Sequence, residues 1–311
     1  MIIEAIKQAQ RVLIIGHPRP DGDCIGAGLT VWHICKKHGK LVDFACDSPA
    51  PSHFSFVPNF EACFTEPSGV YDLAIAVDCA DDLRVGKYIG YFKKARVSIN
   101  IDHHRTNNRF AAHNFVFPEA SSTCEVLFDL LYETGEIDAD CAYWLMVGLS
   151  TDTGHFMHSN TTPHTFEVAQ KLTAFGLELN KISDYLYKNN TREKTKLIAR
   201  AIESMRFFAD GKICLITIMD SDLAECGCVL SDTEGLIDYG MMIGSVDVAV
   251  CITEQKNAFK ASFRSKTVDV AAAATVFGGG GHQKAAGCTV CGKYEDVVRK
   301  VVKSITDGMS F

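Results

Sequence analysis

Apolar and polar residues follow one another along the first two thirds of the chain in a pattern that predicts strands alternating with helices. The run 71–77 is almost wholly apolar, as expected of a parallel strand buried on both faces, and it leads directly into Asp78. The segment 97–101 alternates apolar and polar residues and is rich in β-branched side chains, which predicts a further strand. Strands are expected at 11–15, 40–46, 71–77 and 97–101, and helices at about 1–10, 24–37, 119–134, 138–151, 163–175, 180–189 and 191–205.

The pattern changes after residue 207. An Asp210-Gly211 pair between two apolar segments predicts a β-hairpin that opens a new unit. The remaining expected elements are strands near 246–253 and 258–264 and helices near 268–277 and 294–307.

This order of elements predicts an α/β chain with two domains. Residues 1–190 are expected to form a doubly wound, mostly parallel sheet with helices on both faces, and residues 191–206 a helical linker. Residues 207–311 are expected to form a smaller α+β domain, with the active site in the cleft between the two domains.

Composition narrows the classes of function. With 47 % hydrophobic residues, the 311-residue chain has enough apolar surface for sizeable cores. A formal net charge of −7 argues against a protein that coats long DNA or RNA, but it allows a short anionic substrate in a metal-loaded cleft. The N-terminus lacks a signal-peptide pattern, and the longest uncharged apolar run, 141–151, is too short to span a bilayer. We therefore expect a cytoplasmic protein without a membrane partner.

Thirteen cysteines are many for a chain with these features. We expect them to be reduced and mostly buried thiols. Two close pairs, Cys226/Cys228 and Cys288/Cys291, offer a zinc site as the alternative, but two such pairs about sixty residues apart are weak support for it.

Acidic and histidine side chains follow the ends of the predicted strands. The carboxyl ends of parallel strands share one edge of an open α/β sheet, which is where ligands bind. Three further strand ends are therefore expected to meet the strand that leads into the Asp-His-His sequence at 102–104. The residues concerned are His17, Asp21, Asp23, Asp78, Asp102, His103, His104 and Asp152.

Each of these residues alone has a simpler explanation, because Asp21 or Asp23 could cap a helix and a single histidine is usually a surface or core residue. Together, so many carboxylates without a cation would repel one another. Two imidazoles and four carboxylates are enough for two divalent ions, with one carboxylate bridging. Mixed oxygen and nitrogen ligands suit manganese, with magnesium, cobalt or iron as substitutes. Two such ions support in-line hydrolysis of a phosphoester.

The same residues form motifs that resemble those of a known family. His17-x3-Asp21-x-Asp23, Asp78 in Val-Asp-Cys-Ala-Asp, Asp102-His103-His104, and Asp152 in Ser-Thr-Asp-Thr-Gly resemble the four motifs of the DHH phosphoesterases. Ser262-Phe-Arg264-Ser265 and Gly278-Gly-Gly-Gly-His282-x-x-Ala-Ala-Gly287 are similar to the signature of the DHH-associated C-terminal domain. These six motifs cover nearly the whole chain, and they are most similar to the branch of bifunctional oligoribonucleases and pAp (3′-phosphoadenosine 5′-phosphate) phosphatases.

The resemblance implies two Mn²⁺ ions, with Mg²⁺ or Co²⁺ as substitutes. One ion is expected on His17, Asp21 and Asp78. The second is expected on Asp23, Asp78, His103 and Asp152, so that Asp78 bridges the two. His104 is expected to face the scissile phosphate and either stabilise its charge or protonate the leaving oxygen, with Asp102 supporting it.

Substrate contacts are implied in both domains. Arg84 and Arg105 follow two of the motifs and are expected to help neutralise phosphate, although any surface arginine could occupy those places. In the second domain, Ser262 and Arg264 are expected to contact the substrate, since arginine can clamp a phosphate with two hydrogen bonds. Glycine lets backbone N–H groups close on a phosphate, so the glycine run is interpreted as a substrate-holding loop rather than a flexible linker. Its expected substrate-binding residues are Gly279, Gly280, Gly281 and His282.

The implied activity is hydrolysis of short oligoribonucleotides to nucleoside 5′-monophosphates and of pAp to AMP and phosphate, by two-metal, in-line attack of hydroxide. The alternatives are a phosphodiesterase for linear or cyclic dinucleotides (pApA, c-di-AMP) and a non-catalytic nucleotide sensor. A pyrophosphatase is disfavoured because residues 207–311 lack its Arg-Lys-Lys run, and a RecJ-like exonuclease because further domains and a basic track are not evident. Substrate length, direction of degradation and oligomeric state, a homodimer included, stay open.

Overall fold

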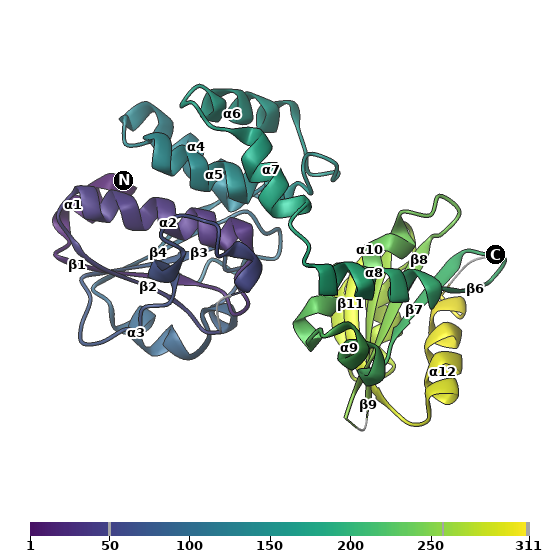
Figure 1. Cartoon of the computed structure of the whole chain (residues 1–311). Helices are drawn as coiled ribbons and strands as arrows, with labels where there is room; N and C mark the ends of the chain where they lie inside the picture. Colours follow the sequence, from purple (N-terminus) through teal and green to yellow (C-terminus); the bar gives the residue numbers. More distant parts are fainter. Residues whose placement is uncertain (49–50, 257, 309–311) are drawn as a thin grey trace. The chain divides into compact units, whose positions relative to one another are not determined.

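The computed structural model describes residues 1–48, 51–256 and 258–308. The chain folds into two compact units, Met1–Asn189 and Asn190–Phe311, each with its own sheet and its own hydrophobic cores (Figure 1). Within the described ranges, no helix combines the length and the apolar character that crossing a membrane requires.

A five-stranded, wholly parallel sheet forms the centre of the first unit. Its strands lie in the order β2-β1-β3-β4-β5. The predicted doubly wound α/β architecture is therefore confirmed, and β5 is an edge strand that the sequence pattern did not predict. The strands are β1 (Arg11–Gly16), β2 (Leu41–Cys46), β3 (Leu73–Val77), β4 (Val97–Asp102) and β5 (His113–Val116).

Helices cover both faces of this sheet, because alternate strand residues point to opposite sides. Ile14 and Ile75 belong to one core, together with residues of α2, α4 and α5. Leu13 and Ala74 belong to the core on the other face, which contains Phe92 of α3. The helices are α1 (Ile2–Gln8), α2 (Gly22–Lys37), α3 (Ile89–Lys94), α4 (Thr123–Leu131), α5 (Ala139–Asp152), α6 (Pro163–Thr173) and α7 (Leu179–Tyr187).

The strand order changes direction between β1 and β3. From β1 the chain continues through α2 to β2 on one side, and then returns to β3 on the other side of β1. Such a switch point leaves a crevice at the carboxyl ends of the two strands, where open α/β sheets bind ligands. His17 directly follows β1 and Asp78 directly follows β3.

A six-stranded mixed sheet forms the second unit. Its order is β10-β11-β9-β8-β7-β6, and only β7 and β8 run parallel. The antiparallel β6–β7 pair is the hairpin predicted at Asp210-Gly211. The strands are β6 (Arg206–Phe208), β7 (Ile213–Ile218), β8 (Val248–Gln255), β9 (Ala258–Ser265), β10 (Gly280–His282) and β11 (Ala285–Cys291).

Helices also lie on both faces of the second sheet. Val270 of α11 and Val301 of α12 are buried in one core, while Leu197 of α8 and Leu236 of α10 are buried in the other. The sequence pattern did not predict α9 or α10. The helices are α8 (Arg192–Glu203), α9 (Asp220–Cys226), α10 (Leu236–Met241), α11 (Val270–Thr275) and α12 (Tyr294–Thr306).

The interpretation of the glycine run as a loop is wrong for part of its length. Gly280–His282 forms β10, which pairs antiparallel with β11. Gly281 has a φ of +149°, and a Cβ there would lie 2.5 Å from the Cα of Ala286. Glycine is therefore required for the close approach of two backbones.

Most cysteines are buried. Eleven of the thirteen are buried, Cys228 is partly exposed, and Cys291 is exposed. Among the described residues, neither pair considered for zinc belongs to a group of three or more potential ligand atoms.

Candidate metal centre

The predicted site residues come from strand ends and from two helices. His17 and Asp78 follow β1 and β3, and Asp102 is the last residue of β4. Asp21 is the N-cap of α2, where its carboxylate accepts hydrogen bonds from the backbone N–H groups of Asp23 and Cys24. The simpler explanation of Asp21 as a helix cap is thus also true.

The placement of Asp152 at a strand end is wrong. Asp152 is the last residue of helix α5, which packs against α2 on the face of the sheet that bears α4. The carboxyl end of α5 nevertheless lies at the same sheet edge as the strand ends. Asp152 therefore still reaches His103, with 3.5 Å between Asp152 Oδ2 and His103 Nε2.

The side chains form two neighbouring groups of potential metal ligands that match the predicted sets, and a further group of Asp78, His103 and His104 overlaps both of them. In the first, His17 Nε2 lies 3.3 Å from Asp78 Oδ2 and 3.8 Å from Asp21 Oδ1. The second group consists of Asp23, His103 and Asp152, whose ligand atoms lie within 4.8 Å of one another.

Asp78 stands between the two groups. Its Oδ2 faces His17, while its Oδ1 lies 3.8 Å from His103 Nε2. The backbone of Asp78 is left-handed, with a φ of +57°, and its Oδ1 accepts a hydrogen bond from the Thr123 hydroxyl at 3.0 Å. Strained conformations of this kind persist where the surroundings hold them, most often at functional sites. The orientation suits a carboxylate shared by two cations.

Both histidines of these groups present Nε2 to the carboxylates. His17 Nδ1 lies 3.0 Å from the carbonyl oxygen of Pro18, and His103 Nδ1 lies 3.3 Å from that of Ala120. A carbonyl only accepts hydrogen bonds, so Nδ1 carries a hydrogen, and in the neutral ring Nε2 is the nitrogen with the lone pair. Metal-binding histidines are typically held in this way, which means that the donor set fits divalent cations.

The buried carboxylates of the second group are crowded. Asp23 is 1 % exposed, and its two oxygens accept hydrogen bonds from the N–H groups of Thr123 and Cys124 at the start of α4. Burial, followed by the charge of Asp78, still raises the pKa of Asp23 to about 7. Burial and the charge of Asp23 raise the pKa of Asp152 to about 8. A cation held between these groups would offset the repulsion.

The imidazole ring of His104 is held by the side chain of Asp102. His104 Nδ1 lies 2.7 Å from Asp102 Oδ1, and Asn107 donates to Asp102 Oδ2 at 2.6 Å. Burial lowers the pKa of His104, but the hydrogen bond to Asp102 and the charges of Asp78 and Asp102 together outweigh it, and the pKa is raised. Asn107 also donates to the side chain of Asn100 at 2.8 Å. The orienting residue Asn107 carries no sequence signal, because its role depends on a turn after the motif.

The predicted arginines differ in their surroundings. Arg105 is largely exposed and forms an ion pair with Glu119 at 3.2 Å. Arg84 is partly buried, and its backbone N–H donates to the Asp81 carboxylate that caps a short 3-10 helix.

Four of the substrate-binding residues predicted in the second unit share one face of its sheet. Ser262 and Arg264 are alternate residues of β9 and lie opposite Gly287 and Ala285 of β11. The same two residues of β11 lie opposite Gly280 and His282 of β10. Because directly opposed residues point to the same side, Ser262, Arg264, Gly280 and His282 lie on one face. Gly281 points to the other face, and Gly279 lies against the backbone of β11, where a Cβ would be 2.3 Å from the Gly287 carbonyl oxygen.

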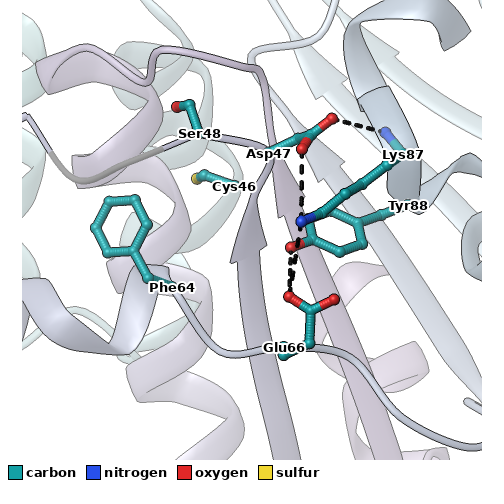
Figure 2. Close-up of a pocket in the computed structure, with 7 residues that line it drawn as sticks. All are labelled: Cys46, Asp47, Ser48, Phe64, Glu66, Lys87 and Tyr88. Atoms are coloured by element: carbon teal, nitrogen blue, oxygen red, sulfur yellow. Dashed lines mark hydrogen bonds and ion pairs between the residues drawn. The ribbon is translucent and has the colours of Figure 1, made fainter.

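A second polar cluster lies at the end of β2 (Figure 2). It lines a cavity of about 480 Å³. Its carboxylates are already paired: Asp47 accepts from the Lys87 N–H at 2.9 Å, and the Tyr88 hydroxyl donates to Glu66 at 3.0 Å. The Ser48 hydroxyl accepts from the N–H of Arg19, which ties this wall to the loop between His17 and Asp21. The lining residues are Cys46, Asp47, Ser48, Phe64, Glu66, Lys87 and Tyr88.

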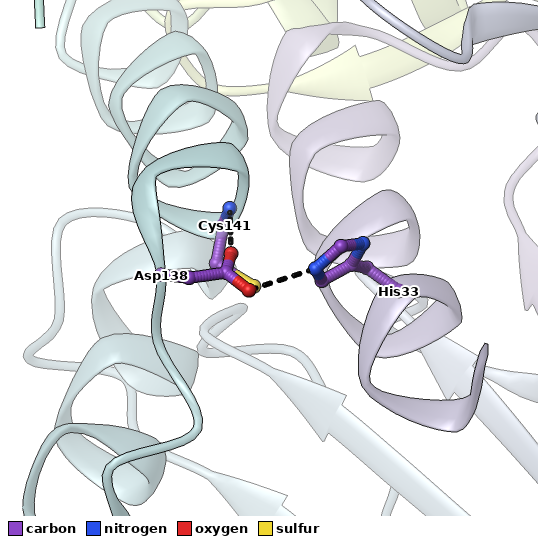
Figure 3. Close-up of side chains that lie close together, drawn as sticks. All are labelled: His33, Asp138 and Cys141. Carbon is purple, nitrogen blue, oxygen red and sulfur yellow. Dashed lines mark hydrogen bonds and ion pairs between the residues drawn. The ribbon is translucent and has the colours of Figure 1, made fainter. Parts of the chain in front are cut away.

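A third cluster, His33, Asp138 and Cys141, also brings three potential ligands together (Figure 3). Asp138 Oδ2 lies 2.9 Å from His33 Nε2 and 3.2 Å from the ammonium group of Lys37, and Asp138 Oδ1 caps α5 by accepting from the Cys141 N–H. The positive charge of Lys37 at this distance disfavours binding of a metal ion to the cluster. The cluster therefore ties the end of α2 to the start of α5.

Comparison with known proteins agrees with the motifs. The model of the DHH family, N-terminal domain, matches residues 11–149, and that of the DHHA1 domain matches residues 231–309. The bifunctional oligoribonuclease and PAP phosphatase NrnA of Thermus thermophilus is 30 % identical over 98 % of this chain and 94 % of its own length. NrnA of Bacillus subtilis is 25 % identical over 93 % of this chain and 92 % of its own length.

Solved structures show the same fold. An exopolyphosphatase-related protein from Bacteroides fragilis has a TM-score of 0.90 at 22 % identity, covering 98 % of this chain and 94 % of that one. RecJ of Thermus thermophilus in complex with Mn²⁺ has a TM-score of 0.53 at 13 % identity, covering 98 % of this chain and 53 % of that one. The resemblance drawn from the motifs is confirmed: the chain belongs to the DHH family of phosphoesterases, in the branch that contains the NrnA proteins.

Proposed function

We propose that this protein hydrolyses short oligoribonucleotides to nucleoside 5′-monophosphates, and pAp to AMP and phosphate, with two divalent cations, for which we expect Mn²⁺. One observation carries the proposal: two groups of ligands meet at the β1/β3 switch point and share the Asp78 carboxylate. The names and activities of the NrnA relatives support the choice of substrates.

We assign the ligands of the two cations as follows. His17, Asp21 and Asp78 would hold one cation. Asp23, His103 and Asp152 would hold the other, with Asp78 shared. Bound there, two divalent cations would neutralise charge on the phosphate and supply hydroxide near neutral pH.

The chain's own groups orient the reaction. His104 is held through Nδ1 by Asp102, so its Nε2 is left for the substrate. In that orientation Nε2 is suited to donate a proton to the leaving oxygen or to stabilise the phosphate charge. Asp102 fixes the ring and favours its charged form.

The second unit would hold the nucleotide. Arg264 is exposed on the same sheet face as Ser262 and His282, and small residues of β11 lie between them. A guanidinium beside small residues allows a phosphate to approach the strand. Arg84 and Arg105 of the first unit would add positive charge near the cations.

The activity is tested by incubating the purified full chain with Mn²⁺ and, in parallel, RNA oligomers of increasing length, pAp, pApA and pyrophosphate. We expect rapid release of mononucleotides from RNAs of two to five residues, and phosphate from pAp. A strong preference for pApA would favour a dinucleotide phosphodiesterase instead. Binding without turnover in the presence of Mn²⁺ would indicate a nucleotide sensor.

A further inference from the structure

Asn160 lies beside the proposed ligand Asp152, eight residues further along the chain. Its side-chain Nδ2 is 2.8 Å from the carbonyl oxygen of Ser121, 3.1 Å from that of Asp152, and 3.4 Å from Asp152 Oδ2. The two N–H groups of the amide face three acceptors, so one hydrogen is shared, and the amide joins the segment that precedes α4 to both the backbone and the carboxylate of Asp152.

The surrounding carbonyls fix the orientation of this amide. A reversed amide would place Oδ1 against the carbonyl oxygens of Ser121 and Asp152, where nothing donates to it. In the orientation observed, Oδ1 is buried without a hydrogen-bond partner, a condition that among the described residues only the Thr161 hydroxyl shares. A buried unpaired oxygen disfavours folding. The Asn160 amide therefore contributes through its Nδ2 donor, while its unpaired Oδ1 lowers the stability of the fold.

The turn between the two residues is strained. Gly154, His155 and Phe156 are successive residues with left-handed backbone, and two of them are not glycine. The His155 N–H donates to the Ser150 carbonyl at 2.7 Å, which closes the turn directly after Asp152. Such strain persists only where contacts on both sides hold it. Asn160 supplies one of these contacts on the returning segment.

We propose that Asn160 is a positioning residue, which fixes the Asp152 carboxylate in the orientation that binds the cation shared with Asp23 and His103. The inference rests on the metal centre of the proposed function and extends it to a residue outside the ligand set. Hydrogen bonds to metal-ligating carboxylates are worth about 10- to 100-fold in metal affinity.

Mn²⁺ binding tests this directly. Free Mn²⁺ is measured by its EPR signal during titration of the metal-free full chain. We expect two ions per wild-type chain, and for Asn160→Ala an affinity about 10- to 100-fold weaker for one ion only. Thr161→Val is the matched control, because it removes the neighbouring unpaired hydroxyl and is expected to bind as the wild type does. An unchanged affinity in Asn160→Ala overturns the inference.

Two further variants separate positioning from a general structural role. Asn160→Asp keeps the size of the side chain but replaces the donor by a carboxylate oxygen, which faces two carbonyl oxygens and the Asp152 carboxylate. Because these groups repel one another, this variant should bind the second ion more weakly than Asn160→Ala. Asn160→Ala combined with Asp152→Ala should bind no more weakly than Asp152→Ala alone, since Asn160 acts through Asp152. If the losses of Mn²⁺ affinity of the two single variants add up in the double variant, Asn160 does not act through Asp152. Metal-free Asn160→Ala should melt close to the wild type, because removal of the buried unpaired Oδ1 offsets the lost contacts of Nδ2. A large loss of stability would indicate a structural role instead.

The outcomes also distinguish this inference from the proposed function. A wild-type chain that binds fewer than two Mn²⁺ ions overturns the metal centre and the role of Asn160 together. Two ions bound with equal affinity by the wild type and by Asn160→Ala overturn the role of Asn160 alone.

Discussion

The buried Asp102 carboxylate offers a test of how His104 is held. Asp102 is fully buried, and its two oxygens accept from different donors, His104 Nδ1 at 2.7 Å and Asn107 Nδ2 at 2.6 Å. The substitution Asp102→Asn keeps the shape and removes one acceptor. Asn107 can only donate at this atom, whereas an imidazole nitrogen can also accept, so the new amide oxygen stays with Asn107 and the new N–H faces His104. His104 then carries its hydrogen on Nε2 and loses the carboxylate that favours its charged form.

The magnitude follows from the one bond that is lost. A hydrogen bond to a charged group contributes about 1.5–3 kcal/mol. With about 1.4 kcal/mol for each factor of ten in rate, the expected decrease in kcat is about 10- to 150-fold. Mn²⁺ binding should be unchanged, because both oxygens of Asp102 point to His104 and Asn107 rather than to the two ligand groups.

The assay combines steady-state kinetics on pAp with an Mn²⁺ titration of the same samples. Asp72→Asn is the matched control: this carboxylate immediately precedes β3 and accepts from the N–H groups of Gln10 and Arg11, at the end of the sheet opposite to the site. It should leave kcat unchanged. An unchanged kcat in Asp102→Asn, or a loss that follows weaker Mn²⁺ binding, would refute the role given to Asp102.

Three further predictions concern other parts of the chain. Burial opposes the ionisation of Asp138, but its contacts with His33, the Cys141 N–H and Lys37 together outweigh burial and lower the carboxyl pKa. The stability that these contacts contribute is therefore present above about pH 4 and is lost as the pH falls below it. Asp138→Asn, which keeps a capping residue, should lower the free energy of unfolding by about 0.5–1 kcal/mol at pH 7 and by less in acid, as urea denaturation at several pH values would show. Arg264→Ala should raise KM for short RNAs about tenfold or more with little change in kcat, since it removes a contact made equally to substrate and transition state; a fall in kcat alone would contradict this. In Gly148→Ala, the new Cβ would clash with Cys124 Sγ and lie 2.9 Å from Asp23 Oδ1. Both stability and Mn²⁺ affinity should therefore fall, stability by about 1–3 kcal/mol in thermal denaturation, and unchanged values would mean that the site tolerates the methyl group.

The architecture of the first unit could be predicted because its strands are long apolar runs. The segment that became β3 has no polar residue between Leu73 and Val77, and all five residues are buried. β5 could not be predicted in the same way, because His113 and Asn114 make its sequence as polar as a loop. In the second unit, β10 and β11 were obscured by glycine and alanine, which are typical of loops and helices rather than strands.

The site could be predicted only as far as strand ends share an edge. That rule brought His17, Asp78 and His103 together, and it misplaced Asp152 because a helix end reaches the same edge. The residues that orient the ligands depend on contacts between segments far apart in the chain. The first turn of α4 donates to Asp23 across about one hundred residues, and no local pattern indicates such a contact.

The most direct test of the account is to count Mn²⁺ ions and measure pAp hydrolysis in the wild type and in Asp78→Asn. Asp78 is the carboxylate that faces both ligand groups, so the account predicts two ions and turnover in the wild type. In the variant it predicts the loss of tight binding at both positions and a decrease in turnover of at least about a thousandfold, given the scale of rate enhancement that metal-ion catalysis supplies. An Asp78→Asn protein that still binds two ions tightly, or still hydrolyses pAp at a rate near that of the wild type, would contradict the shared metal centre.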